Sequence, residues 1–335
     1  MRLPSPQSLS VAVTRRAPTW RPPLPGFVID RALQRDRGGV YPAHPDPKRK
    51  APSYSLRSIE RTRVAMTRTQ RIMDPAPRDL QRELMQLPHC TAERLRVPQS
   101  REGHVILYFH GGAFLRGSTE THIGAISRFM RASRCEALSV DYRMAPEVQF
   151  PAWVDDAVDG YRHLIDSGTD PAKIALGGDS AGGSLVAALL QRIVALELPM
   201  PAAAFVISPW VDLSCSGPSH RENVDSEVMF GPGVIAHCGA WLAKQAGVAT
   251  DDPLLSPAHG TYTAEMPPMR IDVSRVEVLR SDAELLADAY RAGGASAYLH
   301  EHPGAPHAWT AIGTLKAARQ TAKDIGRFVD AHLAS

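Results

Sequence analysis

Gly178-Asp179-Ser180-Ala181-Gly182 is the stretch of the chain that indicates the fold most clearly. The apolar run 173–176 precedes it and predicts a strand, and the Ala- and Leu-rich run 184–196 follows it and predicts a helix. The stretch fits G-x-S-x-G in the strand–turn–helix context that an exposed nucleophilic serine requires. Small neighbours let the turn close and let a substrate approach. The pattern therefore predicts Ser180 as a nucleophile, with Asp179 as a supporting carboxylate.

Short apolar runs alternate with amphipathic helical runs from about residue 90 onward. This alternation predicts an α/β fold in which a mostly parallel sheet is covered by helices on both faces. The expected strands are 105–109, 137–140, 173–176, 203–208, 269–273 and 297–301. The expected helices are 119–131, 153–165, 184–196, 283–292 and 315–333.

The 335 residues suffice for one large domain or for a domain with a small cap. No run approaches the roughly 20 apolar residues of a membrane helix, so no stable membrane insertion is expected. The N-terminus lacks the apolar segment of a secretory signal. Four cysteines have neither metal-site nor disulfide-framework spacing: Cys90, Cys135, Cys215 and Cys238. These features together predict a cytoplasmic protein with free thiols and no metal.

The N-terminal part of the chain is basic. Residues 1–73 hold 15 Lys and Arg against four Asp and Glu, whereas the remainder holds 23 basic and 31 acidic residues. The basic residues are scattered and no nucleic-acid-binding motif accompanies them, so no nucleic-acid partner is expected. Prolines restrict helices in this part to short ones near 27–35 and 56–73. Residues 1–85 are expected to form an N-terminal extension or helical cap, and residues 86–335 the catalytic domain.

A second glycine-containing stretch, His110-Gly111-Gly112-Ala113-Phe114, follows the expected strand 105–109. Attack on a carbonyl carbon builds negative charge on its oxygen, and preorganised N–H donors stabilise that charge. Glycine leaves backbone N–H groups unobstructed. His110 is expected to brace this loop rather than to transfer protons. The expected N–H donors of the oxyanion hole are Gly111, Gly112 and Ala181.

These motifs resemble those of the bacterial hormone-sensitive-lipase-like esterases, which carry H-G-G-G before a G-D-S-A-G elbow. Ala113 stands here in place of the third glycine. Other similar stretches are Asp141-Tyr142-Arg143-Met144-Ala145-Pro146-Glu147, Ser208-Pro209-Trp210-Val211-Asp212-Leu213 and Asp252-Pro253-Leu254-Leu255-Ser256-Pro257. The resemblance covers roughly residues 90–335. It implies an α/β-hydrolase fold and hydrolysis of short- to medium-chain acyl esters without a cofactor. Relatives often dimerise, so a homodimer is a further expectation.

A serine hydroxyl needs a base to take its proton, and the base needs a carboxylate to orient it. In this fold the acid and then the histidine follow the serine along the chain. His307 lies in the stretch Pro303-Gly304-Ala305-Pro306-His307, beyond the last expected strand. A loop in that place can bring an imidazole to Ser180, so His307 is the expected base.

The acid has two candidates. Residues 267–279 align without a gap with the P-P-L-L-I-x-V-G-x-x-E-x-L form of the relatives, which places Glu277 at the acid position and Ser274 at the usual glycine. If residues 276–279 formed a strand instead, Asp282 would be the acid. Asp282 also fits a carboxylate in the first turn of the following helix.

Other functions remain open at this point. An amidase or a hydrolase of specialised-metabolite esters would use the same machinery. A non-catalytic small-molecule binder of this fold commonly lacks the histidine, whereas His307 is present here. Five large side chains are candidates either for the pocket wall or for the core: Phe114, Trp210, Met229, Phe230 and Trp309.

Overall fold

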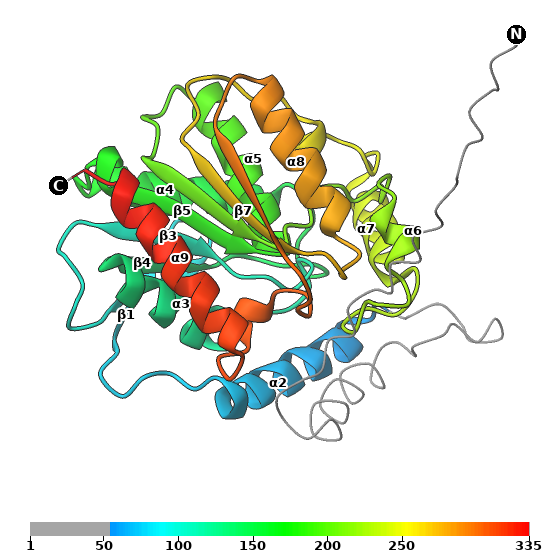
Figure 1. Ribbon diagram of the computed structural model, residues 1–335, viewed down its shortest axis with the longest axis horizontal. Coiled ribbons are helices and arrows are strands. Elements are labelled where there is room, and N and C mark those ends of the chain that lie inside the picture. The colour runs from blue at the N-terminus through cyan, green and yellow to red at the C-terminus, as the bar shows by residue number, and fades with distance from the viewer. Residues whose placement is uncertain (1–53, 335) are drawn as a thin grey trace, which may run out of the picture.

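The computed structural model describes residues 54–334. They form an eight-stranded sheet in the order β1-β2-β4-β3-β5-β6-β7-β8 (Figure 1). The strands are β1 Gln81–Gln86, β2 Thr91–Arg96, β3 Val105–Phe109, β4 Glu136–Asp141, β5 Ile174–Asp179, β6 Ala203–Ile207, β7 Met269–Ser274 and β8 Ala297–His302. β2 is antiparallel to both β1 and β4, and all other neighbouring pairs are parallel. The predicted α/β-hydrolase fold with a mostly parallel sheet is confirmed.

Helices pack on both faces of this sheet (Figure 1). The α-helices are α2 Leu56–Met73, α3 Thr119–Ser133, α4 Ala152–Asp166, α5 Ala181–Ala195, α6 Ser219–Glu222, α7 Val234–Ala246, α8 Arg280–Ala292 and α9 Lys316–His332. Short 3₁₀ turns lie at η1 Pro171–Lys173, η2 Pro257–His259 and η3 Trp309–Ala311. α3 and α9 cover one face, and α4, α5 and α8 cover the other.

Strand β3 shows why the sheet lies in the middle of the core. Its five residues are all buried. Leu107 and Phe109 pack with the α4, α5 and α8 side, whereas Ile106 and Tyr108 pack with the α3 and α9 side. A strand buried on both faces reads as a continuous apolar run, which is why the sequence pattern identified it. Each fully buried large apolar side chain contributes about 1.5–3 kcal/mol to the stability of the fold.

The N-terminal side of the described chain departs from the expectations in its strands. Helix α2 forms over the predicted range 56–73, but the edge strand β1 and its neighbour β2 were not predicted. The short helix expected near residues 27–35 lies outside the described residues.

A long segment between β6 and β7 carries α6 and α7, which the sequence pattern also did not reveal. α7 brings Val234, Ile235 and Cys238 to a pocket that α2 borders from the other side. Two separate parts of the chain therefore border this pocket. All four cysteines are free, as predicted. None of the helices within residues 54–334 is both long and apolar enough to cross a bilayer.

Candidate active site

Ser180 occupies a sharp turn between β5 and α5. Its backbone angles are φ 53° and ψ −121°, a conformation that residues with side chains rarely adopt. The turn is tight because α5 approaches the end of β3: a Cβ added to Gly182 would lie 2.0 Å from the carbonyl oxygen of Phe109. Helix α5 starts at Ala181, so its N-terminal end, which favours negative charge, faces the region around Ser180. The local geometry is that of the predicted nucleophile elbow.

The glycine-containing loop follows β3. Gly112 has φ 128°, where an added Cβ would also lie 1.9 Å from the carbonyl oxygen of Arg116. Ala113 has φ 59°, so it accommodates the left-handed turn that a third glycine would make without strain. The departure from H-G-G-G therefore leaves a sharply bent loop in place.

The predicted oxyanion role of Gly111 needs correction. Its N–H donates to Asp179 Oδ1 at 3.1 Å, so this donor is already occupied. Within residues 54–334, by contrast, the N–H groups of Gly112, Ala113 and Ala181 have no hydrogen-bond partner. The sequence pattern identified Ala113 only as a substitution for glycine and did not indicate its N–H as a candidate donor. The direction of a backbone N–H depends on the loop conformation, which the residue types alone do not determine.

Asp179 supports the glycine-containing loop through a hydrogen bond to Gly111. Its buried carboxylate accepts a hydrogen bond from the hydroxyl of Tyr108 at 2.7 Å and lies 3.3 Å from Nε2 of His122. Burial acts to raise the pKa of Asp179, but the charge and hydrogen bond of His122 outweigh it and lower the pKa below its usual value. The carboxylate therefore stays ionised while it accepts the N–H of Gly111.

His110 is fully buried between other rings. It stacks on Tyr142 with ring centroids 4.3 Å apart, and its Nδ1 lies 2.9 Å from the carbonyl oxygen of Gly111. Burial lowers the pKa of His110 to about 3, so the ring is neutral at physiological pH. A neutral, enclosed imidazole fits the predicted bracing role.

His307 and Glu277 form a buried pair. Nδ1 of His307 lies 2.7 Å from Oε2 of Glu277, so Nδ1 carries the proton and Nε2 is left with a free lone pair. Burial acts to lower the pKa of His307, but the hydrogen bond and charge of Glu277 outweigh it and raise the pKa above 6.5. The ring of Phe230 lies 4.7 Å from that of His307, centroid to centroid. The imidazole is thus oriented on two sides.

The neighbouring strands bring Ser180 and this pair to the same edge of the sheet. The N–H of Ser180 donates to the carbonyl oxygen of Ile207 at 2.9 Å, at the end of β6. Ser208, the next residue, donates its hydroxyl to Glu277 Oε1 at 2.8 Å. Within the described part of the chain, no hydrogen bond of 3.5 Å or less joins Ser180 Oγ to His307. Such bonds are often long without substrate and tighten when it binds.

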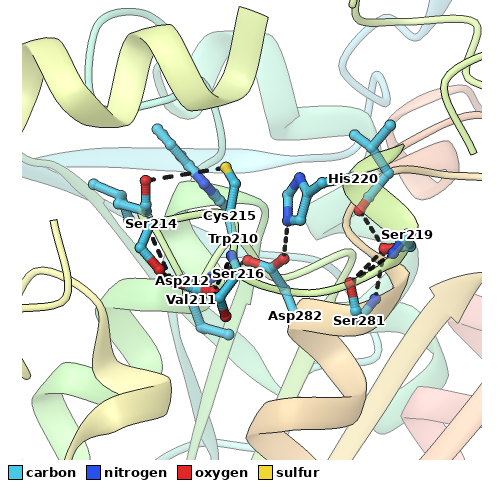
Figure 2. A network of polar contacts seen from close by, with 12 residues as sticks. Trp210, Val211, Asp212, Ser214, Cys215, Ser216, Ser219, His220, Ser281 and Asp282 are labelled. Atoms are coloured by element: carbon cyan, nitrogen blue, oxygen red, sulfur yellow. Dashed lines mark hydrogen bonds and ion pairs between the residues drawn. The ribbon is translucent and has the colours of Figure 1, made fainter. Parts of the chain in front are cut away.

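Asp282 lies elsewhere. It sits in the first turn of α8, as the helix-start interpretation predicted, and points toward His220 (Figure 2). Its Oδ1 lies 2.6 Å from His220 Nε2, and its Oδ2 accepts the N–H groups of Val211 and Asp212 at 3.1 and 3.0 Å. Residues 275–279 form turns, so the alternative in which 276–279 are a strand is wrong. The carboxylate of Asp282 ties the segment after β6 to α8.

The pocket beside this site is mainly apolar. Its walls come from α2, the glycine-containing loop and α7, and are lined by Tyr54, Ser58, Ile59, Thr62, Ala113, Leu115, Arg116, Phe230, Val234, Ile235 and Cys238. Of the five large side chains considered for this wall, Phe230 lines the pocket, whereas Phe114, Trp210 and Trp309 are buried in the core. Met229 is half-buried and does not line the pocket.

Known proteins similar to this chain show the family to which it belongs. The family model described as the alpha/beta hydrolase fold matches residues 106–311. An acetyl-hydrolase of Streptomyces hygroscopicus is 38% identical over 229 residues, covering 68% of this chain and 75% of the relative. The carboxylesterase/phospholipase LipF of Mycobacterium tuberculosis is 32% identical over 257 residues, covering 74% and 68%.

A solved structure is also similar over most of the chain. The crystal structure of an esterase from the bacterial hormone-sensitive lipase family superposes with a TM-score of 0.80 at 31% identity, covering 91% of this chain and 98% of that one. Sequence and structural similarity therefore both indicate the family and the fold. The chain belongs to the alpha/beta hydrolase fold family, among the carboxylic ester hydrolases of the bacterial hormone-sensitive-lipase type.

Proposed function

We propose that the protein is a serine carboxylesterase for short- to medium-chain acyl esters, with Ser180, His307 and Glu277 as its triad. The observation that carries the proposal is the buried 2.7 Å contact between His307 Nδ1 and Glu277 Oε2 at the sheet edge that also holds the strained turn of Ser180. A serine hydroxyl, an oriented imidazole and a carboxylate are the parts that acyl transfer requires.

The reaction proceeds in two steps. Ser180 Oγ attacks the ester carbonyl carbon while its proton passes to Nε2 of His307, and the carbonyl oxygen becomes negative. The N–H groups of Gly112, Ala113 and Ala181 are the proposed donors to that oxygen. The intermediate expels the alcohol, which takes the proton from His307, and leaves an acyl group on Ser180. Water then gives a proton to Nε2 of His307 and attacks the acyl carbon, which forms a second tetrahedral intermediate. This intermediate releases the carboxylic acid as His307 returns the proton to Ser180 Oγ, and the free enzyme is restored.

The pocket supports small acyl groups. Ile59 and Leu115 give it an apolar wall, and Phe230 lines it next to His307. The name acetyl-hydrolase of the relative from Streptomyces hygroscopicus points the same way. None of these chemical steps requires a cofactor or a metal ion.

A series of p-nitrophenyl esters from acetate to dodecanoate tests this proposal. We expect kcat/KM to be highest at the short end and to fall as the acyl chain outgrows the pocket. A matched p-nitroanilide series separates an esterase from an amidase. Folded protein that cleaves neither series would contradict the proposal and favour the non-catalytic binder.

The pH profile of kcat/KM should report His307. The imidazole must be neutral to accept the proton of Ser180, so activity is expected above its pKa and is lost as pH falls through it. Because Glu277 raises that pKa, the midpoint of the acidic limb is expected above 6.5. Glu277→Gln removes the charge that raises it and should move the midpoint to lower pH. A wild-type midpoint well below 6.5 would show that the pair is not formed in solution.

The homodimer, the cytoplasmic location, the lack of a nucleic-acid partner and the domain boundary at residue 86 stay predictions.

A further inference from the structure

Two buried serines lie at the ends of the neighbouring strands β6 and β7. Ser274 is the last residue of β7, Ser208 directly follows β6, and neither is exposed to solvent. The two residues face the loop that carries His307. Neither was predicted to take part in the site.

Each serine hydroxyl accepts a backbone N–H from the histidine loop. The N–H of Ala305 donates to Ser274 Oγ at 3.0 Å, and the N–H of Ala308 donates to Ser208 Oγ at 3.0 Å. These two N–H groups lie on either side of His307 along the chain. The loop is therefore bonded to the strand ends two residues before and one residue after His307.

The same two serines hold the acid. Ser208 Oγ donates to Oε1 of Glu277 at 2.8 Å, and the N–H of Ser274 donates to the same oxygen at 2.7 Å. The other oxygen, Oε2, is thereby left to accept Nδ1 of His307. Acid and base are thus fixed against one common support.

The hydroxyl of Ser208 is both a hydrogen-bond donor and an acceptor. It donates to the carboxylate of Glu277 and accepts from the backbone N–H of Ala308. The backbone of Ser208 has φ 47°, and its N–H donates to the carbonyl oxygen of Asp272 in β7 at 2.7 Å. Alanine keeps the same Cβ and the same backbone demands, so it removes only the hydroxyl.

We propose that Ser208 and Ser274 are positioning residues. They hold the loop of His307 so that Nδ1 of the imidazole stays within hydrogen-bond distance of Glu277. This inference rests on the proposed triad. Neither serine touches the reacting atoms; both act through the loop and the carboxylate. Ser274 replaces the glycine of the relatives' pattern, and in this chain its hydroxyl holds the loop that carries His307.

The kinetic test compares Ser208→Ala and Ser274→Ala with the control Ser133→Ala, a buried serine of α3 whose hydroxyl donates to the carbonyl oxygen of Phe129. Each of the first two should lower kcat by about tenfold, as expected for a lost hydrogen bond to a charged or buried partner, with KM nearly unchanged. The acidic limb of the pH profile should move to lower pH because His307 is held less firmly against Glu277. Ser274→Thr retains a hydroxyl and should restore most of the activity.

A spectroscopic readout makes the result independent of ester turnover. The proton on Nδ1 of His307, bonded to a carboxylate, should give a far-downfield NMR resonance in the wild type. It should broaden or shift in both alanine variants and persist in Ser133→Ala and Ser274→Thr. Wild-type turnover and resonance retained in both alanine variants would overturn the proposal.

Two further outcomes are separable. If the wild type shows the resonance and the variants lose it, but no ester is cleaved, then the positioning role stands and the esterase function falls. If an alanine variant does not unfold cooperatively, Ser208→Cys and Ser274→Cys replace it, because a thiol fills nearly the same space and bonds weakly. They should show the same loss, and wild-type kinetics in both would count against the proposal.

Discussion

Ser180→Ala should lower kcat for a short-chain ester by about 10⁶-fold, leaving only the rate that binding and the oxyanion hole provide. The Oγ atom is the proposed nucleophile, and nothing else in the turn can form the acyl-enzyme. Alanine keeps a Cβ at φ 53°, so the backbone conformation is equally demanding in the variant and the wild type. The midpoint of thermal unfolding should therefore change little.

Ser133→Ala, which removes a buried serine hydroxyl far from the turn, provides the matched control and should keep wild-type kinetics. The residual activity is measured as the product formed during a long incubation with a high concentration of the variant enzyme. A Ser180→Ala protein that retains more than a small percentage of the wild-type kcat, after contamination is excluded, would show that another residue attacks the ester.

Glu277→Gln and Asp282→Asn should differ by orders of magnitude in their effect on catalysis. The amide at Glu277 no longer accepts the Nδ1 proton with a full negative charge and permits the wrong tautomer of His307, so kcat should fall by about 10⁴-fold. Asp282 faces His220 and the backbone after β6 (Figure 2), so its amide variant should lower kcat by less than about tenfold.

Asp282→Asn should affect stability more than catalysis. Asp282 accepts two backbone N–H groups on Oδ2 and pairs with His220 on Oδ1. Its replacement by Asn weakens this buried network and should lower the free energy of unfolding by about 1–3 kcal/mol. Denaturant unfolding monitored beside the ester assay measures both effects. A larger loss of kcat in Asp282→Asn than in Glu277→Gln would transfer the acid role to Asp282.

The central strands and the elbow could be predicted because their physical demands are local. β3 and β5 are buried on both faces and therefore read as apolar runs, and the turn at Ser180 needs small neighbours. β1 is different: five of its six residues are exposed, so it lacks apolar alternation and forms through pairing with β2. Edge strands of this kind carry little signal in the sequence.

The candidate site shows the same limit at finer scale. Chain order pointed to His307, and the resemblance of residues 267–279 to the relatives' pattern pointed to Glu277. The structure brings these two side chains to 2.7 Å. The order of motifs could not show that the N–H of Gly111 donates to Asp179. Because that donor is occupied, Ala113 is the better candidate for the oxyanion hole. It also could not show that the Ser208 hydroxyl faces Glu277, because hydroxyl direction depends on how separate strands align.

Mass spectrometry after reaction with an organophosphonate ester tests the central claim most directly. Such a reagent phosphonylates an activated serine and mimics the tetrahedral intermediate, so its site of attachment identifies the nucleophile. We predict one adduct per chain on the peptide that contains Ser180, loss of esterase activity in proportion to labelling, and no adduct in Ser180→Ala. An adduct on another residue, or none on folded protein that hydrolyses esters, would contradict the account.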